Sequence, residues 1–187
     1  MKIRITPVAV LFLVVLTLTK SYLMPATLLA ALFHECGHLL AAKALNVCVA
    51  CLEIDLFGAK IYPVGFIPSY RAEMLLAAAG PTFSLLLGAF LIPHGGMFIA
   101  ALKNATLSFA LFNLLPIRDF DGGRILQGAL SQLFGEDRAD RVLAVTSYLS
   151  LLFLFSLASC VLLKYGQNLS LAILSASLFA KLFLPRS

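Results

Sequence analysis

The sequence predicts an all-α polytopic membrane protein, with about six transmembrane helices and a small membrane-associated β-hairpin between the second and the third. Composition is the first reason, because 61% of the 187 residues are hydrophobic and only 12% are charged, whereas a soluble domain is about half apolar and a quarter charged. The second reason is that long apolar runs alternate with short polar connections. Lipid offers no partner to backbone groups, so a span is a helix or part of a closed barrel. These runs are too continuously apolar for barrel strands.

Windowed hydropathy places the expected spans at about 6–19, 23–45, 71–92, a fourth beginning between 97 and 105, 140–163 and 168–184. The first run resembles a signal peptide, with a basic start and an apolar stretch, but Lys20 follows at once and no clear cleavage site does. We therefore expect a retained first span. Residues 1–187 are expected to form a single domain, without a soluble regulatory domain.

Positive charge predicts the orientation of these spans. With a cytoplasmic N-terminus, three basic residues fall on or toward the outer side, namely Lys20, Lys103 and Lys164. Eleven fall on the inner side, namely Lys2, Arg4, Lys43, Lys60, Arg71, Arg118, Arg124, Arg138, Arg141, Lys181 and Arg186. This bias predicts that both termini are cytoplasmic. The net charge of +5 therefore reflects orientation, and we expect no nucleic-acid partner.

Two connecting segments have patterns of their own. In residues 52–62, LEIDLFGAKIY, apolar and acidic residues alternate and Phe57-Gly58-Ala59 supplies a turn, which predicts the β-hairpin. Within Arg124–Phe134, apolar residues recur at helical spacing. This predicts a short amphipathic helix on the inner membrane surface.

The motif HECGH at residues 34–38 places ionisable groups inside the second apolar run. On a helix, His34 and His38 project from one face about one turn apart, so both imidazoles can bind one Zn²⁺ while Glu35 reaches the water at the metal. The alternative is a pair of histidines hydrogen-bonded to neighbouring helices. Ionisable groups in a span are costly, however, and are functional by default, so the pattern favours zinc.

A catalytic zinc usually has three protein ligands and keeps a fourth position for water. His94 lies at the outer end of the third run, whereas His38 lies on the cytoplasmic half of the second. Most acidic residues belong to inner loops or to a solvated run, which leaves Asp119 and Asp121. At a rise of about 1.5 Å per residue, Asp121 lies about as deep as His38 if the fourth span enters near Ala105. The pattern alone does not separate the two aspartates.

HECGH together with FNLLPIRDFDGGRIL at 112–126 resembles the site-2 protease family of intramembrane zinc metalloproteases. Four residues match the family's second motif in order, namely Asn113, Pro116, Asp121 and Gly122. The resemblance implies a catalytic core at about 23–126, with Asp121 as the third ligand of one Zn²⁺ and Glu35 as the catalytic base. Where relatives often carry two prolines, this chain has Arg118 and Asp119, a charge pair that could shift the affinity of Asp121 for metal.

Five residues are candidates for substrate-binding or structural roles, namely Asn113, Pro116, Gly80, Pro81 and Gly58. GPTFS at 80–84 is similar to a Gly-Pro feature of the family's third span. An ordinary proline kink is the simpler explanation, and Gly80 would let that helix approach the metal site. Asn113 either orients substrate or makes a polar contact between helices. Pro116 breaks the fourth helix, and the hairpin that contains Gly58 either binds an extended substrate strand or plugs the entrance.

The resemblance implies regulated proteolysis of a membrane-associated or single-span protein within a bacterial cell membrane. The compact chain is similar to the branch of the stage IV sporulation protein FB, which activates a membrane-tethered transcription-factor precursor, although relatives in that branch commonly carry a cytoplasmic regulatory domain. One alternative is an inactive or metal-binding scaffold or transporter on the same fold, against which Glu35 argues, because holding a metal requires no base. A membrane-anchored peptidase with a soluble HExxH domain would need a large polar domain, which this sequence lacks.

Overall fold

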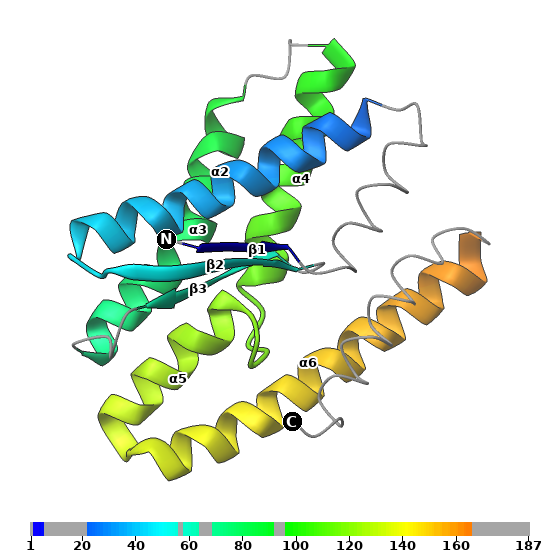
Figure 1. The fold of residues 1–187 in the computed structure, drawn as a ribbon. Helices are drawn as coiled ribbons and strands as arrows, with labels where there is room; N and C mark the ends of the chain where they lie inside the picture. The colour runs from blue at the N-terminus through cyan, green and yellow to red at the C-terminus, as the bar shows by residue number, and fades with distance from the viewer. Residues whose placement is uncertain (1, 6–21, 56–57, 64–68, 92–95, 166–187) are drawn as a thin grey trace. The chain divides into compact units, whose positions relative to one another are not determined.

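The computed structural model describes residues 2–5, 22–55, 58–63, 69–91 and 96–165. The elements follow in the order β1 (Lys2–Ile5), α2 (Leu23–Ala44), β2 (Val49–Asp55), β3 (Gly58–Pro63), α3 (Tyr70–Phe90), α4 (Gly96–Asn113), α5 (Asp121–Phe134) and α6 (Glu136–Tyr165) (Figure 1). They belong to two compact units, Met1–Leu114 and Leu115–Ser187.

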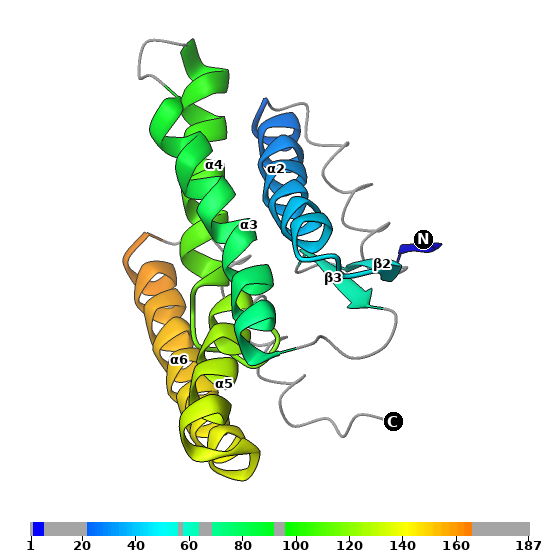
Figure 2. The same cartoon turned by 90° about the vertical axis from the view of Figure 1, so that its left-hand side faces the viewer.

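In the first unit, the three helices α2, α3 and α4 pack against one another in every pair (Figure 2). Near the start of α2 the core is made mostly of small residues, Ala26, Ala30 and Ala101, together with Leu102. Small side chains let helix backbones approach closely, and in lipid this packing is what favours association of helices. Large apolar side chains remain exposed on all three helices, as expected of helices that face lipid.

Two glycines set the closest approaches within this unit. A Cβ on Gly37 of α2 would lie 2.7 Å from the carbonyl oxygen of Ala79 and 2.8 Å from Cβ of Phe83, both in α3. A Cβ on Gly88 of α3 would lie 2.8 Å from Cδ2 of Leu107 in α4. Real Cβ atoms essentially never come closer than 3.0 Å to such neighbours. The first clash involves backbone, whereas the second involves the end of a flexible side chain.

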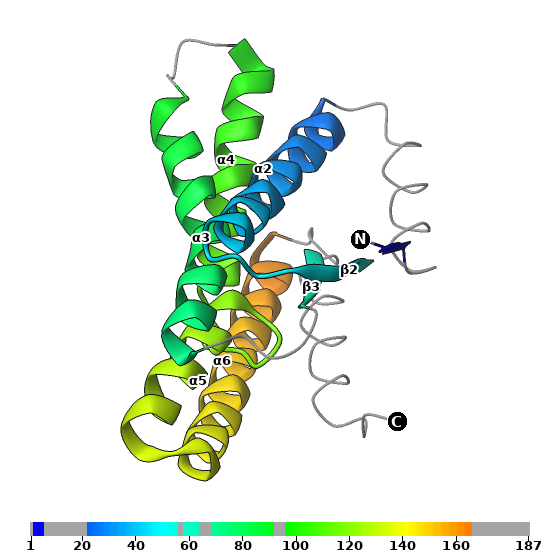
Figure 3. The same cartoon turned by 60° about the vertical axis from the view of Figure 1, so that its left-hand side comes forward.

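The first unit also contains a three-stranded sheet with the order β1-β2-β3, of which β2 and β3 are labelled in Figure 3. β2 and β3 pair antiparallel, with Asp55 opposite Gly58, and β1 pairs parallel with β2, with Lys2 opposite Cys51. The expectation of an all-α protein with a small β-hairpin is therefore corrected, because β1 adds a third strand. Gly58, expected in a turn, is the first residue of β3 and pairs with Asp55 of β2. The four residues Lys2–Ile5 do alternate basic and apolar side chains, but so short a stretch does not stand out beside a long apolar run.

The expectation of six spans is also corrected. Among the described residues, three segments are long and apolar enough to cross a membrane, namely Leu23–Ala44, Tyr70–Phe90 and Glu136–Cys160. The expected fourth span corresponds to α4, which has 18 residues and whose mean hydropathy is lowered by Lys103, Asn104 and Asn113. The expected spans at 6–19 and 168–184 lie outside the described residues.

In the second unit, α5 packs against α6. The amphipathic helix expected within Arg124–Phe134 is confirmed as α5, which begins three residues earlier, at Asp121. Gly135 follows it with a φ of 83°, a conformation that glycine adopts without steric cost. The buried residues of α6 recur every three or four positions and so form one face of the helix, namely Ala139, Leu143, Ser147, Leu151, Leu154 and Ala158.

We predict that Gly37→Ala destabilises the protein more than Gly88→Ala does. At Gly37 the added methyl group meets the backbone of α3, which must move, and such overpacking typically costs about 1–3 kcal/mol. At Gly88 the neighbouring Leu107 side chain can change rotamer instead. Thermal unfolding of both variants in detergent measures the difference. Equal melting temperatures would show that α2 and α3 are not held at the distance described here.

Candidate metal centre

Helix α2 carries the HECGH motif, as the sequence predicts. The side chains of His34 and His38 are 3% and 5% exposed, and their ring centroids are 4.9 Å apart. Glu35 is partly buried, and its Oε2 atom is buried. The ring of Phe109 in α4 lies beside His34, with centroids 6.1 Å apart. The pair of imidazoles is thus enclosed by protein.

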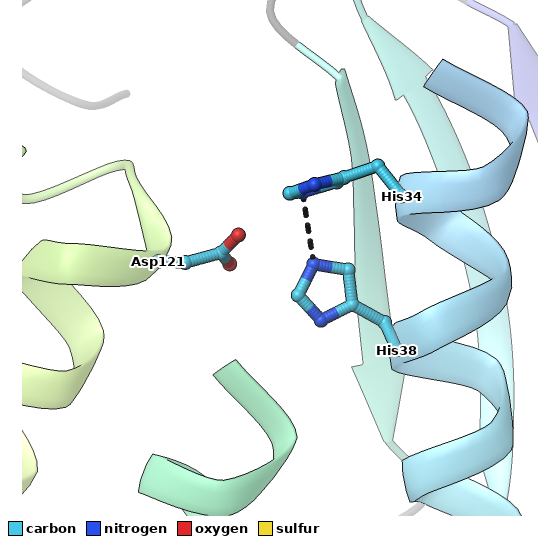
Figure 4. Close-up of side chains that lie close together, drawn as sticks. All are labelled: His34, His38 and Asp121. Carbon is cyan, nitrogen blue, oxygen red and sulfur yellow. Dashed lines mark hydrogen bonds between the residues drawn. The ribbon is translucent and has the colours of Figure 1, made fainter. Parts of the chain in front are cut away.

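Helix α3 holds the Nδ1 atoms of both imidazoles. The Nδ1–H of His38 donates to the carbonyl oxygen of Leu76 at 2.8 Å, and Nδ1 of His34 lies 3.1 Å from the hydroxyl oxygen of Ser84. The two Nε2 atoms lie 3.2 Å apart (Figure 4). Each ring is therefore fixed at one nitrogen while it presents the other to a shared point, which is how metal-ligating histidines are usually oriented.

The hydrogen-bond chemistry of these nitrogens suits a cation between them. A carbonyl oxygen can only accept, so Nδ1 of His38 carries the proton and Nε2 of a neutral His38 is unprotonated. The Ser84 hydroxyl can accept a bond from the Nδ1–H of His34, which leaves the Nε2 of His34 unprotonated too. Without a cation, the Nε2–H of His34 can donate to His38 while Ser84 donates to Nδ1. The Ser84 hydroxyl can therefore form a hydrogen bond with His34 both when a cation is bound and when it is not, as an acceptor in the first case and as a donor in the second.

Gly80 of α3 leaves the space that the two Nε2 atoms occupy. A Cβ built on Gly80 would overlap Nε2 of His38 and would lie 2.8 Å from Nε2 of His34. The close approach that the sequence predicts at Gly80 is therefore present. Pro81 follows inside α3 and is buried. Because proline has no backbone N–H, the helix lacks one donor at this point.

Asp121 is the first residue of α5 and is 8% exposed. The positive end of the helix dipole stabilises a negative charge in this first turn. One ligand atom from each of His34, His38 and Asp121 lies within 4.8 Å of the others (Figure 4). Two imidazoles and a carboxylate are a donor set that zinc prefers.

The structure shows local contacts for two of the other residues that the sequence singles out, Asn113 and Arg118. Nδ2 of Asn113 donates to the carbonyl oxygen of Phe109 in its own helix at 3.0 Å. Pro116 lies in the connection between α4 and α5. Arg118 forms an ion pair with Asp140 of α6 at 3.2 Å. His94 lies outside the described residues.

Sequence reasoning does not find Leu76 and Ser84 as partners of the histidines. Leu76 contributes its backbone carbonyl, which no side-chain pattern reveals. Ser84 has a signal, because it follows Gly80 by four residues and therefore lies on the same face of α3. Gly80 lets this face of α3 approach the two histidines. A hydroxyl on the same face is therefore placed to form a hydrogen bond with one of them.

Comparisons with known proteins agree with this geometry. Residues 96–157 match the model of peptidase family M50. The zinc metalloprotease MJ0392 of Methanocaldococcus jannaschii is 29% identical over 152 residues, which cover 72% of this chain and 44% of that protein. Rip3 of Mycobacterium tuberculosis is 33% identical over 139 residues, covering 63% of this chain and 35% of that protein. For sll0528 of Synechocystis the identity is also 33% over 139 residues, covering 70% and 36%.

The match to the family M50 model covers residues 96–157, which include α4 and α5. The chain spans between about a third and a little under half the length of these curated relatives. A solved structure, the site-2 protease from Methanocaldococcus jannaschii, has a TM-score of 0.71 and 24% sequence identity, and the match covers 96% of this chain and 88% of that one. The chain therefore shares the fold of that solved structure.

We predict that Gly80→Ala removes metal binding while it leaves the fold largely intact. The new Cβ would take the place of the Nε2 atoms, and the imidazoles, as the ends of side chains, can turn away from it. Metal analysis of the purified protein should give a zinc content near background. Gly88→Ala, on the same helix but facing Leu107, is the control and should keep its metal. A Gly80→Ala protein with full zinc content would show that the imidazoles do not meet at this point.

Proposed function

We propose that this chain is an intramembrane zinc metalloprotease that cleaves membrane-associated or single-span proteins. The observation that carries the proposal is the buried imidazole pair in an apolar helix, with both Nδ1 atoms held by α3 and the Nε2 atoms 3.2 Å apart. Ionisable groups in a spanning helix are costly and are functional by default. The match of residues 96–157 to the family M50 model and the fold shared with a solved site-2 protease support the same conclusion.

In this proposal, His34, His38 and Asp121 hold the zinc as two nitrogen ligands and one oxygen ligand. The hydrogen bonds at the Nδ1 atoms support this set, because they orient each imidazole. When bound, Zn²⁺ would act as a Lewis acid toward the scissile carbonyl and would lower the pKa of water in the site.

Glu35 is the proposed general base. It lies between the two histidines on α2, and its carboxylate would take a proton from the attacking water and later donate it to the nitrogen of the leaving amine. The buried histidines and the neighbouring Phe109 ring keep bulk water from this side of the site, which strengthens the electrostatic interactions of the carboxylate.

The proposed setting is a bacterial cell membrane that the chain crosses several times, with both termini in the cytoplasm. Three described helices of sufficient length and hydropathy support it, as does the eleven-to-three bias of basic residues toward the inner side. The proposed substrate must unwind locally, because a peptide bond inside a helix is shielded by the helix's own hydrogen bonds and side chains. β1 and β3 are the outer strands of the sheet and could pair with such an extended segment.

We predict that Asp121→Ala weakens zinc binding, whereas Asp119→Ala does not. Asp121 supplies a ligand atom, so its removal should cost more than the roughly 10–100-fold that loss of a ligand's hydrogen-bond partner costs. Competition with a chromophoric chelator measures the affinity of each variant. The opposite result, with zinc lost only in Asp119→Ala, would assign the wrong aspartate to the metal.

We predict that Glu35→Gln keeps zinc but loses cleavage. Glutamine preserves the size of the side chain but cannot accept the proton, and general-base assistance is typically worth about 10²–10⁴-fold in rate. Zinc content and cleavage of a co-expressed membrane-tethered substrate should be measured on the same preparations. Normal cleavage by Glu35→Gln would contradict the mechanism. A wild-type protein that binds zinc but cleaves no membrane-tethered substrate would instead favour a metal-binding scaffold.

A further inference from the structure

We propose that Ser147 of α6 is a positioning residue for Asp121. The proposal rests on the proposed function, because it takes Asp121 to be a metal ligand. Its evidence is a set of hydrogen bonds within the second unit that join the connection before α5 to the middle of α6. Neither the HECGH motif nor the motif around Asp121 includes Ser147.

The connection in front of Asp121 is irregular backbone. It contains Pro116, and its internal bonds are those of turns, with the N–H of Ile117 donating to the carbonyl of Leu115 at 2.7 Å and the N–H of Phe120 donating to that of Ile117 at 2.9 Å. Asp121 follows Phe120 directly, so the path of this connection sets where α5 begins. Irregular backbone at membrane depth requires protein partners.

Ser147 supplies one of those partners. Its side chain is fully buried, its hydroxyl donates to the carbonyl of Leu143 at 2.6 Å, and its Oγ accepts from the N–H of Arg118 at 3.0 Å. The carbonyl oxygen of Pro116 is farther from Oγ, at 3.4 Å. Since a hydroxyl has one hydrogen, the shorter bond to Leu143 takes it and the lone pairs face Arg118.

Ser156 of the same helix shows what a serine does without this role. Its hydroxyl donates to the carbonyl of Leu152 at 2.9 Å, and its side chain is exposed. The bond to the preceding turn is thus common to both serines and is ordinary helix chemistry. The bond from the N–H of Arg118 distinguishes Ser147.

Two further contacts fix the same connection. A Cβ on Gly123 would overlap the carbonyl oxygen of Ile117, so the first turn of α5 lies directly against the connection. At the surface, Asp140 accepts from Nη2 of Arg118 at 3.2 Å and from Nε2 of Gln127 at 3.0 Å. The side chains of Arg118 and Asp140 are 38% and 53% exposed, so water competes for this ion pair. The side chain of Ser147 is buried, so water competes less for its hydroxyl, and its bond is therefore the stronger constraint.

Ser147→Ala would leave the N–H of Arg118 without its acceptor in a partly buried position. The connection would shift to find another partner, and Asp121 would move with it. Loss of a group that orients a metal ligand typically costs about 10–100-fold in affinity. The ion pair at the surface should matter less, with Asp140→Asn changing affinity by under about fivefold.

The test compares full-length variants in detergent by zinc competition and by the visible absorption of bound Co²⁺, which reports the geometry of the ligands. Ser147→Ala should bind zinc about 10–100-fold more weakly and should alter the Co²⁺ spectrum. Ser147→Thr, which keeps the hydroxyl, should recover most of the affinity. Ser156→Ala is the matched control and should behave as wild type. Unchanged affinity and an unchanged Co²⁺ spectrum in Ser147→Ala would overturn the proposal.

Asp121→Asn in the same assay separates this inference from the function on which it rests. If Asp121→Asn binds metal as wild type does, Asp121 is not a ligand and the proposed function fails. If Asp121→Asn loses affinity and Ser147→Ala does not, only the role of Ser147 fails. Where Ser147→Ala does not fold, Ser147→Cys takes its place, because a thiol is a weaker donor and acceptor and should still weaken metal binding.

Discussion

The proposed metal site depends on how closely α3 approaches α2. Each helix contributes a glycine to this contact, Gly37 of α2 against Ala79 and Gly80 of α3 against the two imidazoles. Because Ala79 and Gly80 are neighbours, one short stretch of α3 touches both the backbone of α2 and its functional side chains. With a larger residue at either glycine, the Leu76 carbonyl and the Ser84 hydroxyl would not reach the Nδ1 atoms. The same close approach of α3 to α2 therefore determines both the packing of the two helices and the orientation of the imidazoles.

The hydrogen bonds between α3 and the histidines contribute more to the orientation of the imidazoles than to the stability of the protein. Bonds between helices in a membrane are worth only about 0.6–2 kcal/mol, which is small beside the cost of placing two histidines in an apolar helix. The bonds from α3 nevertheless decide which nitrogen of each imidazole faces the shared point. The same logic holds in the second unit, where α6 supports a turn through a hydroxyl rather than through apolar packing alone.

The candidate metal ligands could be proposed from sequence, whereas two of the groups that support them, the Leu76 carbonyl and Ser147, could not. The spacing of His34 and His38 is a property of any helix, so their convergence followed from the pattern alone. Asp121 required a family resemblance, because depth along a span does not distinguish it from Asp119. Leu76 acts through its backbone, and Ser147 lies in a different helix from the residue it positions. Such contacts exist only once the chain is folded, and no local pattern reports them.

The predicted number of spans and the predicted all-α fold were both wrong. The fourth expected span corresponds to α4, but over the whole helix Lys103, Asn104 and Asn113 lower the mean hydropathy. β1 is stabilised by pairing with a strand far along the chain, with Lys2 opposite Cys51, so its own four residues carry little signal. Periodicity along the sequence reveals an element when one of its faces is buried against a segment close to it in the chain. The partner of β1 is β2, which lies far along the chain.

That pairing also has a consequence for the order of folding. The strand made first cannot find its partner until the chain has been synthesised through β2, by which time α2 and its histidines have already emerged. Contacts between such distant segments form slowly, because the intervening chain must be ordered before the pairing repays the loss of entropy. The sheet is therefore expected to assemble after α2 has formed, and β1 would be among the last elements to be fixed.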